Sequence, residues 1–281
     1  MRIDQRIRSS CRKRLASLMY PFRSRGWYKH YPRETIGTED GVERLCRELL
    51  ELTCGCVFGG PFAGMVLPEY SQLRKWPNII VGCYEEELHG IISEVISDPP
   101  SRVIDIGAGH GYYAVGLALM TSQLRVTAFE MEEHRHTEIE EFAKANGVRQ
   151  RVELRGKCTP DALREELSTE EECFIICDCE GYENELLNPA AISGFLKATI
   201  LCELHDFYTP GLTGTLVERF RQTHSIEIIN ETPRMPQHYR ILRTFPAHVA
   251  QICCDETRHI CPPWRLVSGR FMMLRPKARA S

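Results

Sequence analysis

The chain has 281 residues, of which 43% are hydrophobic and 26% are charged, and this composition excludes a disordered or collagen-like protein. Its formal net charge of −3 at pH 7 predicts no general attraction to nucleic acid or to a membrane surface. No apolar run is long enough to cross a bilayer, and the short apolar stretch at residues 15–20, flanked by basic residues, does not resemble a secretory signal.

Thirteen cysteines are spread along the chain, and several lie inside apolar runs, among them Cys173, Cys177 and Cys202. An odd number of cysteines, placed in this way, fits buried and reduced thiols better than a disulfide framework. We therefore expect a cytoplasmic protein.

The first part of the chain has a composition of its own. Residues 1 to about 33 are basic and poor in acids, which fits contact with an anionic surface or partner, or targeting, although a solvated terminal helix is favoured. Residues 41–52 and 84–96 have the apolar spacing of amphipathic helices. Residues 56–67 are rich in glycine and aromatic residues, and we predict short strands around a turn there.

The stretch at residues 103–118 changes its pattern twice. An apolar run with β-branched residues contains Asp105 near its end, and the apolar pattern then lengthens from Tyr112 onward. Three glycines stand between them at alternate positions: Gly107, Gly109 and Gly111. This order predicts a strand, a tight turn and a helix. The glycines let a ligand approach the main chain, and the start of the helix offers it free N–H groups.

A second acid, Glu130, follows the next apolar strand, which we predict at residues 124–129. It comes at roughly the 20-residue distance at which an acidic residue at a strand end binds ribose hydroxyls. A dinucleotide fingerprint has the spacing G-x-G-x-x-G, whereas the glycines here are spaced G-x-G-x-G. The spacing therefore disfavours an NAD-dependent oxidoreductase, which stays as an alternative.

Further apolar runs continue the alternation of strands and helices. The predicted strands are residues 151–154, 173–177, 199–202, 225–229 and 269–274. Continuous apolar strands separated by helices predict an α/β fold, with a doubly wound, mostly parallel sheet and helices on both faces. We expect residues 1–100 to form a helical and hairpin cap and residues 101–281 to form the ligand-binding domain.

Two motifs resemble a known family. The sequence Asp-Ile-Gly-Ala-Gly-His-Gly at residues 105–111, followed by Glu130, resembles the nucleoside-binding half of Rossmann-like methyltransferases that use S-adenosylmethionine (SAM). The sequence Asp-Cys-Glu-Gly-Tyr-Glu at residues 178–183, before a strand that ends Glu-Leu-His, is similar to the Asp-x-Glu-Gly-x-Glu signature of their FkbM-type branch. The resemblance covers roughly residues 100–220.

The resemblance implies SAM as methyl donor and a small-molecule acceptor, such as the hydroxyl of a sugar or natural product. Asp105 to Gly111 would hold the methionine end, Glu130 the ribose, and the turn at Cys158 and Thr159 the adenine edge. The implied SAM-binding residues are Asp105, Gly107, Gly109, Gly111, Tyr112, Glu130, Cys158, Thr159 and Asp178. Methyltransferases that act on amide or adenine nitrogens usually have an Asn/Asp-Pro-Pro-Tyr/Phe turn where this chain has the sequence Asp-Cys-Glu-Gly, so a hydroxyl acceptor is favoured.

Three residues at the ends of neighbouring strands, Asp178, Glu203 and His205, are the candidate catalytic residues. His205 could take the proton of the acceptor, oriented by Asp206 or Asp178. Alternatively, the three side chains could hold a divalent metal such as Mg²⁺ or Mn²⁺ that acidifies the hydroxyl. A structural role is the third alternative, in which Asp178 caps the next helix and Glu203 pairs with an arginine.

Two further interpretations stay open at this point. For Glu183 we favour a role as a helix cap in contact with solvent. The second is that the protein is not an enzyme and binds SAM without turning it over. Formation of S-adenosylhomocysteine (SAH) would distinguish an enzyme from such a binding protein.

Overall fold

The computed structural model describes residues 39–168, 171–256 and 270–277, so the predicted basic segment at the start of the chain lies outside the described residues. The chain divides into two compact units. Unit 1 takes in the described residues up to His89, together with Lys144–Gly147 and the described residues from Thr232. Unit 2 consists of Gly90–Ala143, Val148–Glu231 and the described residues after Arg258. The division at residue 100 stays a prediction.

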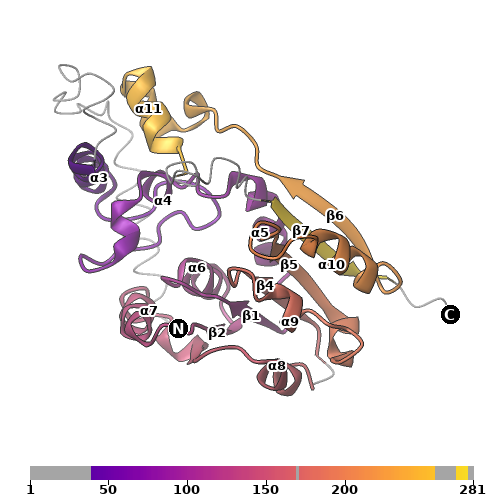
Figure 1. The fold of residues 1–281 in the computed structure, drawn as a ribbon. Helices are drawn as coiled ribbons and strands as arrows, with labels where there is room; N and C mark the ends of the chain where they lie inside the picture. Colours follow the sequence, from indigo (N-terminus) through magenta and orange to yellow (C-terminus); the bar gives the residue numbers. More distant parts are fainter. Residues whose placement is uncertain (1–38, 169–170, 257–269, 278–281) are drawn as a thin grey trace. The chain divides into compact units, whose positions relative to one another are not determined.

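Unit 2 is built on one sheet of seven strands in the order β3-β2-β1-β4-β5-β7-β6 (Figure 1). The strands are β1 Arg102–Ile106, β2 Arg125–Phe129, β3 Val152–Arg155, β4 Cys173–Cys177, β5 Ala198–Glu203, β6 His224–Asn230 and β7 Arg270–Pro276. Strands β1 to β5 pair in parallel, and β7 runs antiparallel between β5 and β6. The predicted doubly wound, mostly parallel sheet is confirmed.

The register aligns the carboxyl ends of the parallel strands. Ile106 of β1 pairs with Phe129 of β2 and with Cys177 of β4, and Cys177 pairs with Cys202 of β5. The residues that follow these strands therefore lie at the same edge of the sheet. From β1 the chain proceeds to β2 and β3 on one side and to β4 and β5 on the other, and ligands bind at such a switch point.

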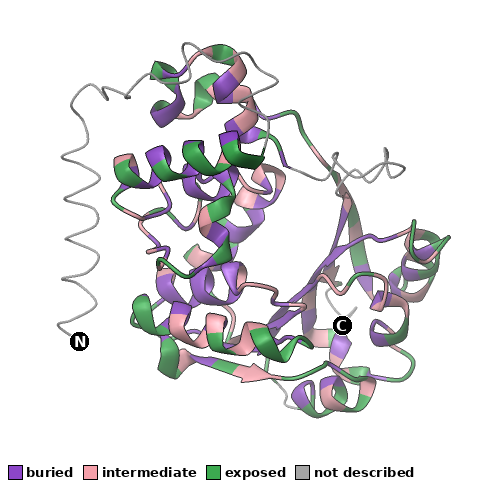
Figure 2. Ribbon diagram, turned by 60° about the vertical axis from the view of Figure 1, so that its left-hand side comes forward, coloured by how far each residue is buried: buried purple, intermediate pink, exposed green. Residues whose placement is uncertain are grey.

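Helices cover both faces of this sheet. Unit 2 contains the helices α6 Tyr112–Met120, α8 Pro160–Glu166, α9 Glu183–Leu186 and α10 Leu212–Phe220, with short 3-10 helices at Arg149–Arg151 and Ser193–Lys197. It also contains most of α5 His89–Ser97, whose first residue belongs to unit 1, and most of α7 Glu133–Ala145, whose last two residues belong to unit 1. Apolar residues of α8, α9 and α10 share a core with alternate residues of β1, β4 and β5. Helix α6 contacts β1, β2 and β3 from the other side (Figure 1). Strands β1, β2, β4, β5 and β7 are buried along most of their length (Figure 2), as the continuous apolar runs predict.

Unit 1 is mainly helical. Its helices are α3 Glu39–Thr53, α4 Pro77–Val81 and α11 Ala247–Cys254, with 3-10 helices at Gln72–Lys75, Glu86–Leu88, Pro236–His238 and Arg240–Thr244. Helix α3 confirms the amphipathic prediction, because Leu45, Leu49 and Leu50 are all buried. No helix in the described part of the chain is long and apolar enough to span a membrane.

Two expectations for the first 100 residues differ from the structure. Within the described residues, residues 56–67 contain no strand but only a single antiparallel bridge between Cys56 and Val66. A Cβ atom on Gly82 would lie 2.2 Å from the carbonyl oxygen of Gly59, so the chain folds back here through close main-chain approach. The helix predicted at residues 84–96 is present as α5, but it begins only at His89, after a 3-10 helix at Glu86–Leu88 whose N-cap, Glu85, has a left-handed conformation with φ of 48°.

A buried ion cluster joins distant segments of unit 1. Arg234 pairs with Glu87 at 2.7 Å and also with Glu256, and all three side chains are buried. Glu256 also accepts a hydrogen bond from the main-chain N–H of Glu85 at 2.7 Å. The segment between β6 and β7 is thereby joined to the turn before α5, and removal of one member would leave a buried charge unpaired.

Candidate active site

The glycine turn after β1 brings two strand ends together. The N–H groups of Gly107 and Ala108 both donate to the carbonyl oxygen of Phe129, at 2.9 and 3.0 Å. Gly107 has φ of 82°, and a Cβ atom at this position would lie 1.7 Å from the carbonyl oxygen of Asp178. Only glycine permits this approach, which places the turn directly against the chain that leaves β4.

Glu130 closes the turn from the side of β2. Its carboxylate accepts hydrogen bonds from the N–H groups of Gly109 and Glu132, at 2.7 and 2.8 Å. Arg135 lies 3.6 Å from the same carboxylate. Each carboxylate oxygen has a second lone pair, so Glu130 can hold the glycine turn and still accept a hydroxyl donor.

Asp105 is the buried acid of the site. Burial, together with the neighbouring charge of Glu130, raises the pKa of Asp105 to about 7, although a hydrogen bond from the main chain of Ala114 opposes the shift. Its Oδ2 atom is buried and has no hydrogen-bond partner among the described residues. A buried acceptor of this kind fits a ligand that brings a cationic N–H donor.

The raised pKa of Asp105 predicts a pH-dependent stability. Between about pH 4 and pH 7 the folded protein keeps this proton while the unfolded chain has lost it, so the free energy of unfolding falls as the pH rises through this window. Asp105→Asn removes the titration. We expect the stability of the variant relative to wild type to increase by about 3 kcal/mol from pH 5 to pH 8 in urea unfolding.

Asp161→Asn is the matched control, because the side chain of Asp161 is 90% exposed and should give no such change. A stability difference between Asp105→Asn and wild type that is the same at both pH values would contradict the assignment.

The other predicted cofactor residues lie around the same edge of the sheet. Tyr112 is buried at the first position of α6, which begins directly after Gly111. Cys158 is buried after β3, and burial raises the pKa of its thiol to about 12, so the thiol is neutral at physiological pH. Thr159 is exposed and accepts a hydrogen bond from the N–H of Ala162 as the N-cap of α8, as its sequence position suggests.

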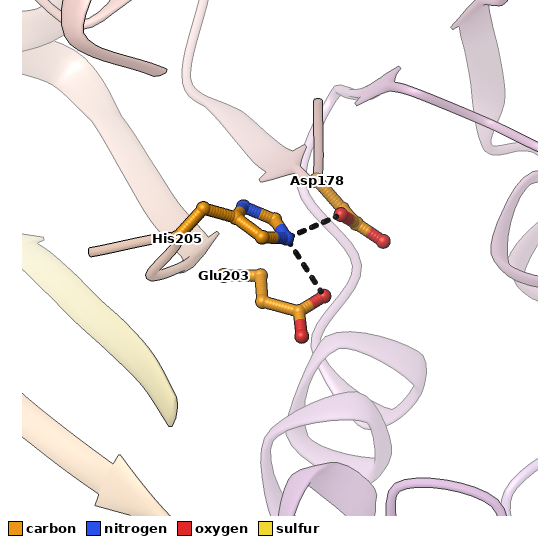
Figure 3. Close-up of side chains that lie close together, drawn as sticks. All are labelled: Asp178, Glu203 and His205. Carbon is orange, nitrogen blue, oxygen red and sulfur yellow. Dashed lines mark ion pairs between the residues drawn. The ribbon is translucent and has the colours of Figure 1, made fainter. Parts of the chain in front are cut away.

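The three candidate catalytic side chains converge (Figure 3). The Nε2 atom of His205 lies 3.6 Å from Oδ1 of Asp178 and 4.0 Å from Oε2 of Glu203. One ligand atom from each of the three residues lies within 4.8 Å of the other two. The alignment of β4 and β5 explains the convergence, because it places the residues after both strands side by side.

Glu183 is a residue of the candidate site that the sequence reasoning missed. Its side chain is fully buried, and Oε1 accepts a hydrogen bond from Nδ1 of His205 at 2.7 Å. The expectation of a solvent-exposed cap for Glu183 was therefore wrong. Asp206 does not orient His205 either: its carboxylate accepts hydrogen bonds from the N–H and hydroxyl of Thr213 in α10.

The electrostatics of this pair follow from its hydrogen bond. Burial acts to raise the pKa of Glu183, but the hydrogen bond from His205, the charge of His205 and main-chain N–H groups together lower it. Burial likewise acts to lower the pKa of His205, but the hydrogen bond to Glu183 and the nearby carboxylates raise it. An ionised Glu183 accepts only, so Nδ1 of His205 carries a proton, and Nε2 faces the carboxylates of Asp178, Glu180 and Glu203.

The sheet order, with an antiparallel β7 between β5 and β6, is that of the Rossmann-like methyltransferase fold class. No family model matches the sequence, and no curated protein matches it.

Among solved structures, the chain is similar to a putative O-methyltransferase from Klebsiella pneumoniae, with 14% identity and a TM-score of 0.45 over 98% of this chain and 100% of that one. It is also similar to the O-methyltransferase TomG from Streptomyces achromogenes, with 12% identity and a TM-score of 0.46 over 92% and 100%. A precorrin-6y C5,15-methyltransferase from Geobacter metallireducens has 18% identity and a TM-score of 0.40 over 51% and 76%. Similarity at these identities and TM-scores carries no functional argument, and the function proposed below rests on the residues of this chain.

Proposed function

We propose that the protein is a SAM-dependent methyltransferase that methylates a hydroxyl of a small molecule. The observation that carries this proposal is the placement of two ligand sites at one edge of the sheet. The glycine turn with Asp105 and Glu130 lies against the main chain of Asp178, and Asp178 is at the same time a member of the cluster with Glu203 and His205. A nucleoside-binding turn beside a proton-accepting cluster suits transfer of a group from a nucleoside to a hydroxyl.

Each part of the proposed cofactor site has a chemical reason. The unpaired buried oxygen of Asp105 fits the amino group of the methionine part. Glu130, after β2, fits the ribose hydroxyls. We assign the turn of Cys158 and Thr159 to the adenine edge and Tyr112 to the start of the helix that faces the ligand. When bound, SAM supplies a methyl group activated by its sulfonium.

The cluster manages the proton of the acceptor. We propose that Asp178, Glu203 and His205 orient the hydroxyl, and that Nε2 of His205 accepts its proton as the new bond forms. Glu183 fixes the ring by accepting the hydrogen bond from Nδ1, and the two carboxylates stabilise the imidazolium that results. Glu183 is therefore a positioning residue, and His205 is the proposed catalytic residue.

The same three residues also fit a divalent cation. Two carboxylates and an imidazole whose other nitrogen is held by a carboxylate form a common arrangement of metal ligands. Asp178, Glu203 and His205 would hold Mg²⁺ or Mn²⁺, which would lower the pKa of the bound hydroxyl. Activity assays with a chelator distinguish this version from direct proton transfer.

The finer parts of the proposal rest on the sequence. The segment at residues 178–183 supports placement in the FkbM-type branch, where sugars and natural products are acceptors. The described cysteines are free thiols, which supports a cytoplasmic location.

Calorimetry with SAM, SAH and NAD tests the proposed function. We expect SAM and SAH to bind and NAD to give no binding heat. Glu130→Ala should weaken SAM binding by about 1–3 kcal/mol, because ribose hydroxyls lose their acceptor. The exposed Glu153, on neighbouring β3, provides the matched control as Glu153→Ala. NAD binding without SAM binding would favour the oxidoreductase, and SAM binding without any turnover to SAH would favour the non-catalytic protein.

A further inference from the structure

Two adjacent aromatic side chains are exposed beside the catalytic cluster. Phe207 and Tyr208 follow His205 in the chain, and they are 39% and 56% exposed. Their ring centroids lie 3.8 Å apart at an interplanar angle of 37°. Two aromatic rings that contact each other while both remain open to solvent present a contiguous apolar surface, and exposed apolar surface of this kind marks binding sites.

The loop that carries these rings is held in place by hydrogen bonds and close packing. The N–H groups of Tyr208 and Thr209 both donate to the carbonyl oxygen of His205 at 3.0 Å. The hydroxyl of Thr209 donates to the carbonyl oxygen of Gly181 at 3.1 Å. A Cβ atom on Gly181 would lie 2.9 Å from Cβ of Tyr208, so the loops after β4 and β5 pack closely. The surface is therefore preorganised rather than loosely attached.

The rings lie close to the atoms that would react. The ring centroid of His205 is 6.2 Å from that of Phe207 and 6.0 Å from that of Tyr208. A ring-shaped ligand stacked on Phe207 or Tyr208 would thus place a substituent within reach of Nε2 of His205.

The charges around this surface limit what it can bind. The carboxylates of Asp178, Glu180 and Glu203 all lie within 4.0 Å of Nε2 of His205. The side chain of Glu180 is 72% exposed, so its charge faces any arriving ligand. Carboxylates repel phosphate, sulfate or carboxylate groups, and they accept hydrogen bonds from hydroxyls.

We infer that Phe207 and Tyr208 form the binding surface for the methyl acceptor, and that the acceptor is a ring compound that bears a hydroxyl and no anionic group. The inference rests on the proposed function and adds the acceptor class and the two residues that select it. The ring packs on the aromatic faces, and its hydroxyl lies among the carboxylates next to His205. A phenol ring and a sugar ring share this chemistry.

Saturation-transfer NMR in the presence of SAH tests the inference with four probes. Phenol and methyl β-D-glucopyranoside represent the two kinds of uncharged ring, 4-hydroxybenzoate is an anionic phenol, and tyramine is a cationic one. We expect transfer to at least one uncharged probe, which identifies the kind of ring. Transfer to 4-hydroxybenzoate should be at least about fivefold weaker than to phenol, whereas transfer to tyramine should be no weaker than to phenol, because carboxylates attract a cation.

The matched variants are F207L/Y208L and L196A. The double variant keeps apolar volume against Gly181 but removes both ring faces, and its signal with the uncharged probe should fall about tenfold. Leu196 is a similarly exposed apolar residue, 42% exposed, ahead of β5 at the opposite edge of the sheet, so L196A should keep the signal. SAH affinity, measured by calorimetry, should be the same in all three proteins.

Each failure has its own meaning. An unchanged probe signal in F207L/Y208L, no transfer to either uncharged probe, stronger transfer to 4-hydroxybenzoate than to phenol, or weaker transfer to tyramine than to phenol overturns the inference while SAH binding upholds the cofactor site. If wild type does not bind SAH, the proposed function fails first. If F207L/Y208L loses SAH affinity, the two rings serve the cofactor site or the fold, and the inference is wrong.

Discussion

His205→Ala should lower the rate of SAH formation by about 10²–10⁴-fold and leave SAM affinity close to that of wild type. The reason is the position of Nε2, which faces Asp178 and Glu203 but is not part of the glycine turn that would hold the nucleoside. The measurement is single-turnover formation of SAH with any acceptor that wild type methylates, together with calorimetry for SAM. If His205→Ala turns over at the wild-type rate, both versions of the mechanism are wrong.

Two additions make this experiment sharper. Chelator treatment that abolishes wild-type activity, with rescue by Mg²⁺ or Mn²⁺, assigns the cluster to a metal, and unchanged activity assigns His205 to direct proton transfer. Glu183→Gln should also slow turnover and shift its pH profile, because an amide cannot fix the tautomer and charge of His205 as a carboxylate does. Glu185→Gln is the control, since Glu185 is exposed on the same short helix α9.

Gly107→Ala should cost several kcal/mol of stability and remove SAM binding. The added Cβ atom would lie 1.7 Å from the carbonyl oxygen of Asp178, and the φ of 82° is unfavourable for any residue with a side chain. To fit, the turn after β1 and the chain after β4 would have to separate, which would disrupt the proposed cofactor and catalytic sites together.

Gly109→Ala is the matched control for this prediction. Gly109 has φ of 55°, but the nearest atom to an added Cβ is 3.9 Å away. We therefore expect only the smaller cost of the left-handed backbone, about 1–2 kcal/mol. Urea unfolding and SAM calorimetry on both variants provide the measurement, and equal losses in the two would show that close approach to Asp178 is not the cause.

Local patterns were sufficient to predict the sheet and its functional edge. A strand that is buried on both faces must be apolar throughout, so β1, β4 and β5 are visible as runs in the sequence. Because parallel strands end at a common edge, the residues that follow them can be grouped from the order of the strands in the chain. Asp178, Glu203 and His205 converge for this reason.

The role of Glu183 could not be predicted in the same way. Its place at the start of a short helix suggests a cap, and its partner His205 is 22 positions away in the chain. The contact depends on how two loops pack after two different strands, and no periodicity encodes that. The same limit applies to residues 56–67, where the close approach of Gly59 and Gly82 replaced the expected strands.

The buried cluster of Arg234, Glu87 and Glu256 has a consequence for synthesis on the ribosome. Glu85 and Glu256, which are joined by a hydrogen bond, are 171 positions apart, and all five parallel strands lie in the interval between them. The strands can therefore pair while unit 1 still lacks α11 and Arg234, the only described cation of its buried cluster. During that time the apolar face of α4, which α11 contacts in the finished protein, lacks that partner. We expect nascent chains to depend on chaperones until Glu256 has left the exit tunnel. Unit 1, whose first segment is synthesised before the parallel strands, is therefore completed only after them.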